Sequence, residues 1–445
     1  MAILLGDKNL SVIEEVVLTS SQTYTARRTG IADVICIGAG GQGGSSGKTG
    51  LAINNLTGGG AGGYSRKRIP ITTGDTFTVV VGAGGQASST KLPGAGNLTA
   101  GGDGGESTFD HASATANIAL DSNGGAGGLA NQTTTASGAT YAGGAGGTAT
   151  GGDVNFTGGR GGTITRSNSN SNQGCFATGG GAVAVFGSAF NGGDINFTAS
   201  GNYTVAGTGG AGIGGNGGNI AFGTSSNNAQ LASGGGSASG EGNGFTATQT
   251  DATANPLTAA AKTDMVVGGG RLPSHGGHAR ANTSSDDSIA GNGGTSAPRA
   301  VLAGSGDSSY QTVFGGNERP TEVIDTAGST AEDFSSGFPI FPSGTTYPQA
   351  TGPGGGGGAA SYTDTSSSAT TVIAAGNGAT YGGGGAAITP MGTELASTLE
   401  RISGNGRGGI AGGGSGACYL GTNAATATIE WASGGDGVVV IQYLG

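Results

Sequence analysis

The glycines of this chain recur in a fixed unit, Gly-Gly-x-Gly-Gly, which places glycine at two of every three positions. Three residues make one turn of a left-handed polyproline-II-type helix, which has no internal hydrogen bonds. Glycine on two of its three faces would let neighbouring helices approach until their backbones hydrogen-bond. The unit therefore leaves two alternatives, a bundle of extended glycine helices or a disordered low-complexity chain. Copies lie at 124–128, 143–147, 158–162 and 214–218.

Composition restricts how an ordered form could be stabilised. Glycine supplies 103 of 445 residues, 10% are charged and 34% belong to the nine apolar types, which leave glycine out. Average globular domains have about 25% charged residues and 45–50% apolar residues when glycine is counted among them. A conventional core of normal size is therefore not expected. Because ordering glycine costs roughly 0.5–1 kcal/mol more than ordering alanine, an ordered chain needs dense main-chain hydrogen bonding. We expect this ordered form.

Charge and cysteine content exclude several classes of partner. The net charge is −10, without long runs of like charge, which argues against nucleic acid or an anionic membrane as a partner. Cys36, Cys175 and Cys418 are odd in number and far apart, so they predict neither a disulfide framework nor a metal-ligand pair. The N-terminal MAILLGDK has only a short apolar stretch before Gly6 and Asp7, too short for the apolar region of a signal peptide, and no apolar run reaches 18 residues. We expect a soluble, unexported protein that does not insert into membranes.

Conventional strand signals lie near the two ends of the chain. We expect the β-branched runs to form one sheet, because a sheet needs three or more strands to be stable alone. Pro70 suggests that its strand is at an edge, and residues 11–18 are a further expected strand. The predicted fold class is all-β with irregular parts, in which a small sheet made by N- and C-terminal strands clamps an inserted polyglycine-II bundle. The four runs are 31–37, 64–71, 76–82 and 437–443.

The middle of the chain contains diverged copies of one element. GGDVNFTG at 151–158 is echoed by GGDINFT at 192–198 and more weakly by GGNIAF at 217–222. Each copy has an aliphatic and an aromatic residue two positions apart, as a short strand would use to bury one face. We expect stacked rungs.

These patterns divide the chain into six regions. The first is an N-terminal attachment strand segment, and the others are a sheet base, a glycine-rich bundle, an insertion bearing prolines and aromatic residues, a second glycine-rich bundle and a closing strand. Their bounds are 1–30, 31–85, 86–250, 251–350, 351–433 and 434–445.

Two motifs suggest nucleotide binding but lack its context. Residues 38–43 satisfy GxGxxG, and residues 47–49 read Gly-Lys-Thr. A dinucleotide site needs a helix after the glycines, whereas LAINNLTGGGAGGY follows here without helical periodicity. The GAGGQ element also recurs after a second strand at 82–86, so it is better explained as the way the chain leaves its sheet. We expect no nucleotide or other cofactor.

Metal binding and catalysis are also not expected. His275 and His278 are three residues apart, but glycine between them disfavours the helix on which that spacing would have meaning. The acidic pairs 286–287 and 332–333 are interpreted as exposed loop charges, because nothing near them suggests a pocket that would shift a pKa. The sequence therefore predicts no enzyme.

Taken in order, several segments resemble the glycine-rich domain of bacteriophage tail fibres and other virion appendage proteins. In that family a strand leads into GAGG, GGGAGGY precedes a charged strand, TxGDTFTVVVGAGG follows, and the chain closes with GGDGVVVIQY. The resemblance implies packed polyglycine-II helices whose connecting loops contact a host receptor. Residues 251–350 have no clear counterpart. The matching segments are 35–41, 58–64, 73–85, 151–157, 192–198 and 434–443.

From this resemblance we expect a virion surface protein, a tail fibre or fibre-tip adhesin. Its expected partners are other virion proteins, further copies of itself (a trimer is possible) and a host glycan or outer-membrane protein. The alternatives are a capsid-surface decoration or filament-forming subunit without receptor contact, and, more weakly, an ice- or glycan-binding protein. The expected contact surface is the aromatic cluster in a segment that has lost the glycine period. Its members are Tyr310, Phe314, Phe334, Phe338, Phe341 and Tyr347.

Overall fold

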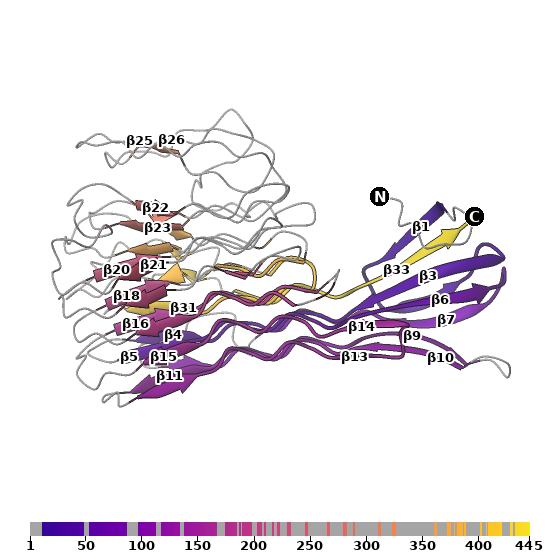
Figure 1. Cartoon of the computed structure of the whole chain (residues 1–445), viewed down its shortest axis with the longest axis horizontal. Helices are drawn as coiled ribbons and strands as arrows, with labels where there is room; N and C mark the ends of the chain where they lie inside the picture. The colour runs from indigo at the N-terminus through magenta and orange to yellow at the C-terminus, as the bar shows by residue number, and fades with distance from the viewer. Residues whose placement is uncertain are drawn as a thin grey trace.

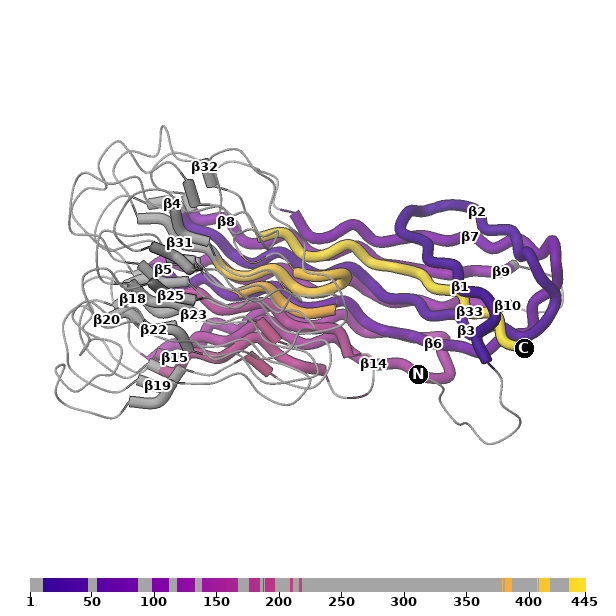
Figure 2. The backbone as a smooth tube through the Cα atoms, turned by 90° about the horizontal axis from the view of Figure 1, so that it is seen from above, coloured from indigo at the N-terminus to yellow at the C-terminus, as the bar shows by residue number. Residues whose placement is uncertain are grey.

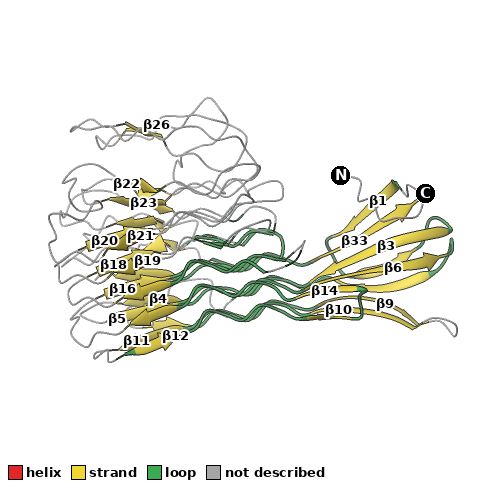
Figure 3. Ribbon diagram, in the orientation of Figure 1, coloured by secondary structure: helices red, strands yellow, loops and turns green. Residues whose placement is uncertain are grey.

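The computed structural model describes residues 11–48, 53–86, 97–112, 117–133, 138–166, 174–184, 187, 189–197 and 432–445, together with short segments between 203 and 429. The described parts follow one another along a single long axis (Figure 1). At one end lies a two-sheet sandwich, called the base. At the other lie several sheets of short strands, called the distal end. Glycine tracts run between them and belong to no helix or strand (Figure 3).

The base consists of two five-stranded sheets. The first has the order β1-β33-β3-β6-β14 and the second the order β13-β10-β9-β7-β2. The strands of the first sheet are β1 (Val12–Leu18), β33 (Val438–Leu444), β3 (Gly30–Ile37), β6 (Tyr64–Ile71) and β14 (Val154–Phe156). Those of the second are β13 (Ala149–Thr150), β10 (Asn117–Ser122), β9 (Ser107–Ala112), β7 (Thr76–Val80) and β2 (Gln22–Thr25).

Alternating side chains from both sheets form the hydrophobic core of the base. On β7, Phe77 and Val79 are buried while their neighbours are exposed, as period-two alternation dictates for a strand with one buried face. Phe77 stacks on Phe109 of β9, with ring centroids 4.6 Å apart. The first sheet contributes aliphatic side chains, among them Val34, Val439 and Ile441.

The predicted clamp is present. β33 pairs antiparallel with both β1 and β3, so the C-terminal strand lies between the two N-terminal ones, and residues 11–18 contain a strand as expected. Pro70 pairs with β3, and β14 faces β6 only over Tyr64–Arg66, so Pro70 lies in the part of β6 that is an edge.

One part of the single-sheet prediction is wrong. β7 pairs with β2 and β9 in the second sheet, not with the other three runs. The physical reason is burial. The apolar face of the first sheet needs a cover, and the alternating face of β7 with Phe77 and Val79 helps to provide it.

A buried carboxylate lies on the opposite face of the first sheet. Asp33 of β3 is 2% exposed and pairs with Arg66 and Arg68 of β6. Nε and one terminal nitrogen of Arg68 donate to the two Asp33 oxygens at 2.8 and 3.0 Å. Although burial opposes ionisation, the hydrogen bonds from both arginines lower the pKa of Asp33.

Backbone hydrogen bonds in the glycine tracts recur every third residue. Tract 57–63 illustrates this, because its N–H groups donate to three neighbouring tracts in rotation. Those of Thr57, Gly60 and Gly63 donate to tract 123–129, those of Gly59 and Gly62 to tract 411–414, and that of Ala61 to Gly159. Tracts from distant parts of the sequence therefore lie side by side (Figure 2).

Glycine is required in these tracts because the backbones approach so closely. A Cβ added at Gly62 would lie 1.8 Å from the carbonyl oxygen of Gly38, and one at Gly40 would lie 1.9 Å from that of Gly412. Backbone strain is not the reason, since the described glycines with positive φ lie outside these tracts. The tracts are therefore held together by hydrogen bonds between main-chain groups, as the composition predicts.

The distal end is built from stacked short strands. The β5 sheet has the order β11-β5-β16-β18-β20, the β15 sheet has β12-β15-β17-β19-β21, and a seven-stranded sheet has β22-β23-β27-β29-β31-β4-β8. A four-stranded sheet, β24-β28-β30-β32, and the pair β25-β26 complete the described strands.

The strands of the β5 sheet are β11 (Ala130–Thr133), β5 (Ile53–Leu56), β16 (Gly174–Ala177), β18 (Tyr203–Ala206) and β20 (Ala229–Ala232). Those of the β15 sheet are β12 (Ala139–Tyr141), β15 (Ile164–Arg166), β17 (Ile195–Phe197), β19 (Ile220–Phe222) and β21 (Phe245–Ala247).

The remaining distal strands are β22 (Met265–Val267), β23 (Ala279–Asn282), β27 (Ala360–Tyr362), β29 (Ala387–Ile388), β31 (Ala417–Leu420), β4 (Ser45–Lys48) and β8 (Asn97–Thr99). The others are β24 (Ser288–Ile289), β28 (Val372–Ala374), β30 (Arg401–Ile402), β32 (Thr428–Ile429), β25 (Tyr310–Thr312) and β26 (Val323–Asp325).

Two of the three predicted rungs stack as expected. β17 and β19 are parallel, with Ile195 opposite Ile220 and Phe197 opposite Phe222. The first copy behaves differently, because β14 pairs antiparallel with β6 in the base. Its sequence is similar, but tract 142–148 has returned the chain to the base before β14 begins, where the edge of β6 is the available partner.

Candidate functional surface

The predicted aromatic contact cluster falls almost wholly outside the described residues. Tyr310 begins β25 and pairs with Asp325 of β26, and nothing further is described of its side chain. The other members, Phe314, Phe334, Phe338, Phe341 and Tyr347, lie outside the described residues. The assignment of this cluster as a contact surface therefore stays a prediction.

The glycine motif at 38–43 is part of the tract lattice. The N–H groups of Gly38, Gly40 and Gly41 donate to the carbonyls of Gly63, Gly435 and Gly60 at 2.8–3.0 Å. The tract then continues into strand β4 rather than a helix. These donors are thus committed to protein carbonyls, whereas a phosphate-binding loop would leave them open.

The other motifs give no site in the described part of the chain. His275 and His278 and the acidic pairs 286–287 and 332–333 lie outside it. Among the residues that are described, no group of three histidine, cysteine, aspartate or glutamate side chains could hold a metal ion. The same residues include no helix with the length and apolarity needed to cross a bilayer.

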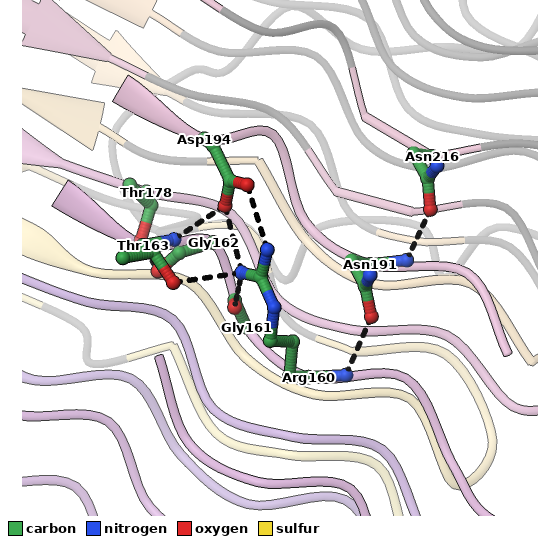
Figure 4. Close-up of polar contacts among 8 residues, drawn as sticks. All are labelled: Arg160, Gly161, Gly162, Thr163, Thr178, Asn191, Asp194 and Asn216. Atoms are coloured by element: carbon green, nitrogen blue, oxygen red, sulfur yellow. Dashed lines mark hydrogen bonds and ion pairs between the residues drawn. The ribbon is translucent and has the colours of Figure 1, made fainter. Parts of the chain in front are cut away.

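A polar cluster instead marks the junction between the tracts and the β15 sheet (Figure 4). Arg160, the variable residue of tract 158–162, forms a bidentate pair with Asp194, which immediately precedes β17. Its two terminal nitrogens donate to the two carboxylate oxygens at 2.7 and 2.6 Å. Planar pairing of this kind is the strong form of an ion pair because two parallel hydrogen bonds fix its geometry.

Thr163 completes this cluster. Arg160 donates to its hydroxyl at 2.8 Å, and the Thr163 N–H donates to Asp194 at 2.7 Å. The hydrogen bond with Asp194 raises the pKa of Arg160. The side chains of Arg160 and Asp194 are 37% and 40% exposed, so the pair remains accessible to a ligand.

Side-chain oxygens of asparagine and aspartate residues cap backbone N–H groups of other tracts. The Asn191 side-chain oxygen accepts from the Arg160 N–H at 3.0 Å, and that of Asn216 accepts from the Asn191 N–H at 2.8 Å (Figure 4). Asp103 does the same for Gly127, and Asp436 for Gly84, both at 2.7 Å. The variable position of the glycine unit thus supplies side-chain acceptors to backbone N–H groups that donate to no backbone carbonyl.

The outer face of the β15 sheet extends from this cluster. Thr140, Thr165 and Asn196 occupy matching positions on three adjacent strands, and they are half-buried or exposed. At the alternate positions of β15 and β17, Ile164, Arg166 and Ile195 are buried. Adjacent strands lie about 4.8 Å apart, so the face presents an evenly spaced row of hydroxyl and amide groups. Such a row can donate and accept hydrogen bonds.

On the buried side, Arg166 joins this sheet to its neighbour. It is 1% exposed, and its guanidinium lies 4.6 Å from the centre of the Phe176 ring on β16. Burial lowers the pKa of Arg166 to about 10. A cation placed over an aromatic face gains electrostatic attraction, so this contact helps to fix the distance between the two sheets.

Sequence reasoning did not single out Arg160, Asn191, Asp194 or Asn216. The sequence nevertheless contains a signal, because all four lie at non-glycine positions of glycine-rich units. Arg160, Asn191 and Asn216 also share one spacing, since each lies four residues before the first residue of the strand that follows it. The glycines of the unit predict the packing of the tracts, whereas the polar contacts come from the residues between them.

A family model described as a glycine-rich domain matches residues 17–255, more than half of the chain. The chain belongs to this family. The matched part of the glycine-rich domain begins within β1 and continues beyond β21, so it includes the polar cluster and the whole β15 sheet. No curated protein matches the chain.

Proposed function

We propose that this glycine-rich domain protein is a virion structural protein, a tail fibre or fibre-tip adhesin that presents its distal end to a receptor on the host cell surface. One observation carries the proposal. β1 and β33 lie together in the base, and the short-stranded sheets lie at the opposite end of the tracts (Figure 1). A particle that holds the base would project the distal end outward.

The tracts give this arrangement its stiffness. We infer that they are polyglycine-II helices. Successive N–H groups of a tract donate to three neighbouring tracts in turn, and carbonyl oxygens of neighbouring tracts lie where the Cβ of any other residue would be. Each tract is thereby bonded on several sides. Such a lattice would act as a rigid spacer that transmits force from the distal end to the base without a large hydrophobic core.

The proposed receptor contact is the aromatic cluster Tyr310 to Tyr347. In a chain with 5% aromatic residues, six gather in this one segment, and aromatic anchors dominate interface energetics. Pro320, Pro339, Pro342 and Pro348 would limit the conformations of the segment and lower the ordering cost of binding. The proposed partner is a host glycan or an outer-membrane protein, contacted without catalysis.

The second candidate is a structural subunit of a capsid surface or filament, which contacts other virion proteins or further copies of itself instead of a receptor. It is favoured by the same aromatic segment, because a buried subunit interface also needs such anchors. The position of residues 251–350 in the particle distinguishes the two. They would face outward in an adhesin and would be covered by a neighbouring subunit in a structural protein.

The test is alanine substitution of Tyr310, Phe334 and Tyr347 together, with particle assembly and host attachment measured separately. We expect normal assembly and a loss of attachment of about tenfold or more, since each lost anchor costs over about 1 kcal/mol. The matched control replaces three exposed residues of the base, Ile13, Val17 and Ile31, which are 52%, 53% and 40% exposed, and should leave attachment unchanged. Full attachment by the aromatic variant would refute the receptor role, whereas failed assembly would favour the structural subunit.

A further inference from the structure

Several tracts contain an asparagine followed by glycine, a pair with intrinsic chemical reactivity. Glycine has no side chain to shield its backbone nitrogen, which can reach the side-chain carbonyl of the preceding asparagine. The structure describes both residues of three such pairs, Asn123–Gly124, Asn191–Gly192 and Asn216–Gly217. Similar sequences with different surroundings allow their reactivities to be compared directly.

The reaction needs only water as co-reactant. The glycine nitrogen loses its proton to solvent and attacks Cγ of the asparagine, so that an N–Cγ bond forms. The Cγ–Nδ2 bond then breaks, and Nδ2 takes up a proton from solvent and leaves as ammonia. Water adds to either carbonyl of the resulting five-membered imide, the ring C–N bond at that carbonyl breaks and its nitrogen is protonated, which yields aspartate or isoaspartate. To reach Cγ, the peptide group between the two residues must rotate and release its hydrogen bonds.

At Asn191 the lattice opposes this rotation at three points. The Gly192 N–H donates to the Arg160 carbonyl at 3.1 Å, and the Asn191 carbonyl accepts from the Gly217 N–H at 2.9 Å. The Asn191 side-chain oxygen is held by the Arg160 N–H. The attacking Gly192 nitrogen, the Asn191 carbonyl and the Asn191 side-chain amide are therefore each held by a hydrogen bond.

Asn216 is held in a similar way. The nucleophile of this pair, the Gly217 nitrogen, donates to Asn191, and the Asn216 side-chain oxygen accepts from the Asn191 N–H. Attack would again require the loss of the hydrogen bond made by the nucleophile itself.

Asn123 differs at the nucleophile. Its side chain is exposed, and within the described residues the Gly124 N–H donates to no acceptor. The Asn123 amide nitrogen makes one bond, to the Thr148 hydroxyl at 3.0 Å. Rotation would still release the bond from the Gly63 N–H to the Asn123 carbonyl, but the attacking nitrogen has no bond to a described residue to lose.

We propose that Asn123 is a site of spontaneous imide formation and conversion to aspartate and isoaspartate in the folded protein, and that the lattice protects Asn191 and Asn216. The consequence is structural. Isoaspartate adds one carbon to the backbone at the start of tract 123–129, which bonds to tracts 38–44, 57–63, 101–105 and 142–148. The added atom breaks the three-residue period where these five tracts meet.

The test is peptide mapping by mass spectrometry after timed incubation of the full chain under mildly alkaline conditions, in native buffer and in denaturant. In denaturant the three pairs should react at similar rates. In the native protein Asn191 and Asn216 should each react about tenfold or more slowly than Asn123, because several hydrogen bonds must break at those two sites. Equal native rates, or a faster reaction at Asn191 or Asn216, would overturn the proposal.

Two variants make the test independent of general unfolding. Thr148→Val removes the acceptor that holds the Asn123 side chain, and it should accelerate reaction at Asn123 roughly two- to tenfold while leaving Asn191 and Asn216 unchanged. Asn123→Ser should abolish the product at this position without altering the thermal midpoint by more than a few degrees. If Thr148→Val accelerates all three sites together, the cause is lattice opening and the proposal fails.

Discussion

The hydroxyl oxygens of Tyr24 and Tyr443, 419 residues apart in the sequence, lie 2.8 Å from each other in the buried interior of the base. Tyr24 belongs to the second sheet and Tyr443 to the first. The Arg27 N–H donates to the Tyr443 hydroxyl at 3.1 Å. Burial, together with the hydrogen bond to Tyr443, raises the pKa of Tyr24. This bond joins the second sheet to the strand that ends the chain.

We expect Tyr443→Phe to destabilise the base by about 1–3 kcal/mol, because it leaves the Tyr24 hydroxyl and the Arg27 N–H without their partner. Tyr24→Phe should cost less, since Tyr443 keeps its bond from Arg27. The double variant should cost less than the two single changes added together. Equilibrium unfolding measured by near-UV circular dichroism checks this, and strict additivity would contradict the coupling.

Substitution of a lattice glycine should be far more harmful than substitution of a glycine elsewhere. Gly62→Ala places a Cβ 1.8 Å from a backbone oxygen, which cannot move without disturbing its own tract, so we expect a loss of about 4 kcal/mol or more. The control is Gly138→Ala, where the nearest atom would be 4.0 Å away. Comparison of the two thermal midpoints decides the matter, and a stable Gly62 variant would argue against close tract packing.

The amide caps can be tested with two asparagines of the same segment. Asn191→Ala leaves the Arg160 N–H without its acceptor and should destabilise the protein by about 1 kcal/mol. Asn196→Ala removes an exposed side chain of the β15 sheet and should change stability by less than about 0.5 kcal/mol. Hydrogen exchange at the Arg160 amide should accelerate only in the first variant. Protection that survives Asn191→Ala would show that the cap is not needed.

Acid should weaken the base through Asp33. Its pKa is lowered in the folded state, so the unfolded chain binds more protons in the window between the two pKa values. The stabilisation is therefore fully present above the unfolded value of about 3.9 and is lost as the pH falls through the folded value. Denaturation curves from about pH 6 to about pH 2 should show this decline, and Asp33→Asn should flatten it. An unchanged decline in that variant would assign it to other carboxylates.

The strands of the base were predictable because their signal is local. The β-branched residues of 31–37 and 438–443 identify strands without further context, and their pairing follows because a short sheet needs three or more strands to be stable alone. The sheet to which β7 belongs was not predictable in this way. Phe77 and Val79 show that one face is buried, but they do not say against which partner, and that choice depends on Phe109 and on residues far along the chain.

The polar cluster at the β15 sheet was harder to predict from the sequence, for a different reason. Arg160 and Asp194 are 34 residues apart, and only the parallel register of β15 with β17 brings them together. The repeated spacing predicted that rungs would stack. It did not predict that β14 would pair with β6 in the base. The copies have nearly identical sequences, and what differs between them is which strand has an unpaired edge at their position in the fold.

Rotation of hydrogen-bond direction by about a third of a turn per residue limits how such a chain can change its length over evolution. Loss of a single residue from tract 57–63 would turn every later donor toward the wrong neighbour and would drive the Ala61 side chain against a backbone. Loss of three residues would preserve the directions and shorten the tract. Lineages of this domain should therefore vary their tracts in multiples of three residues, while the segments between the distal strands carry insertions of any length.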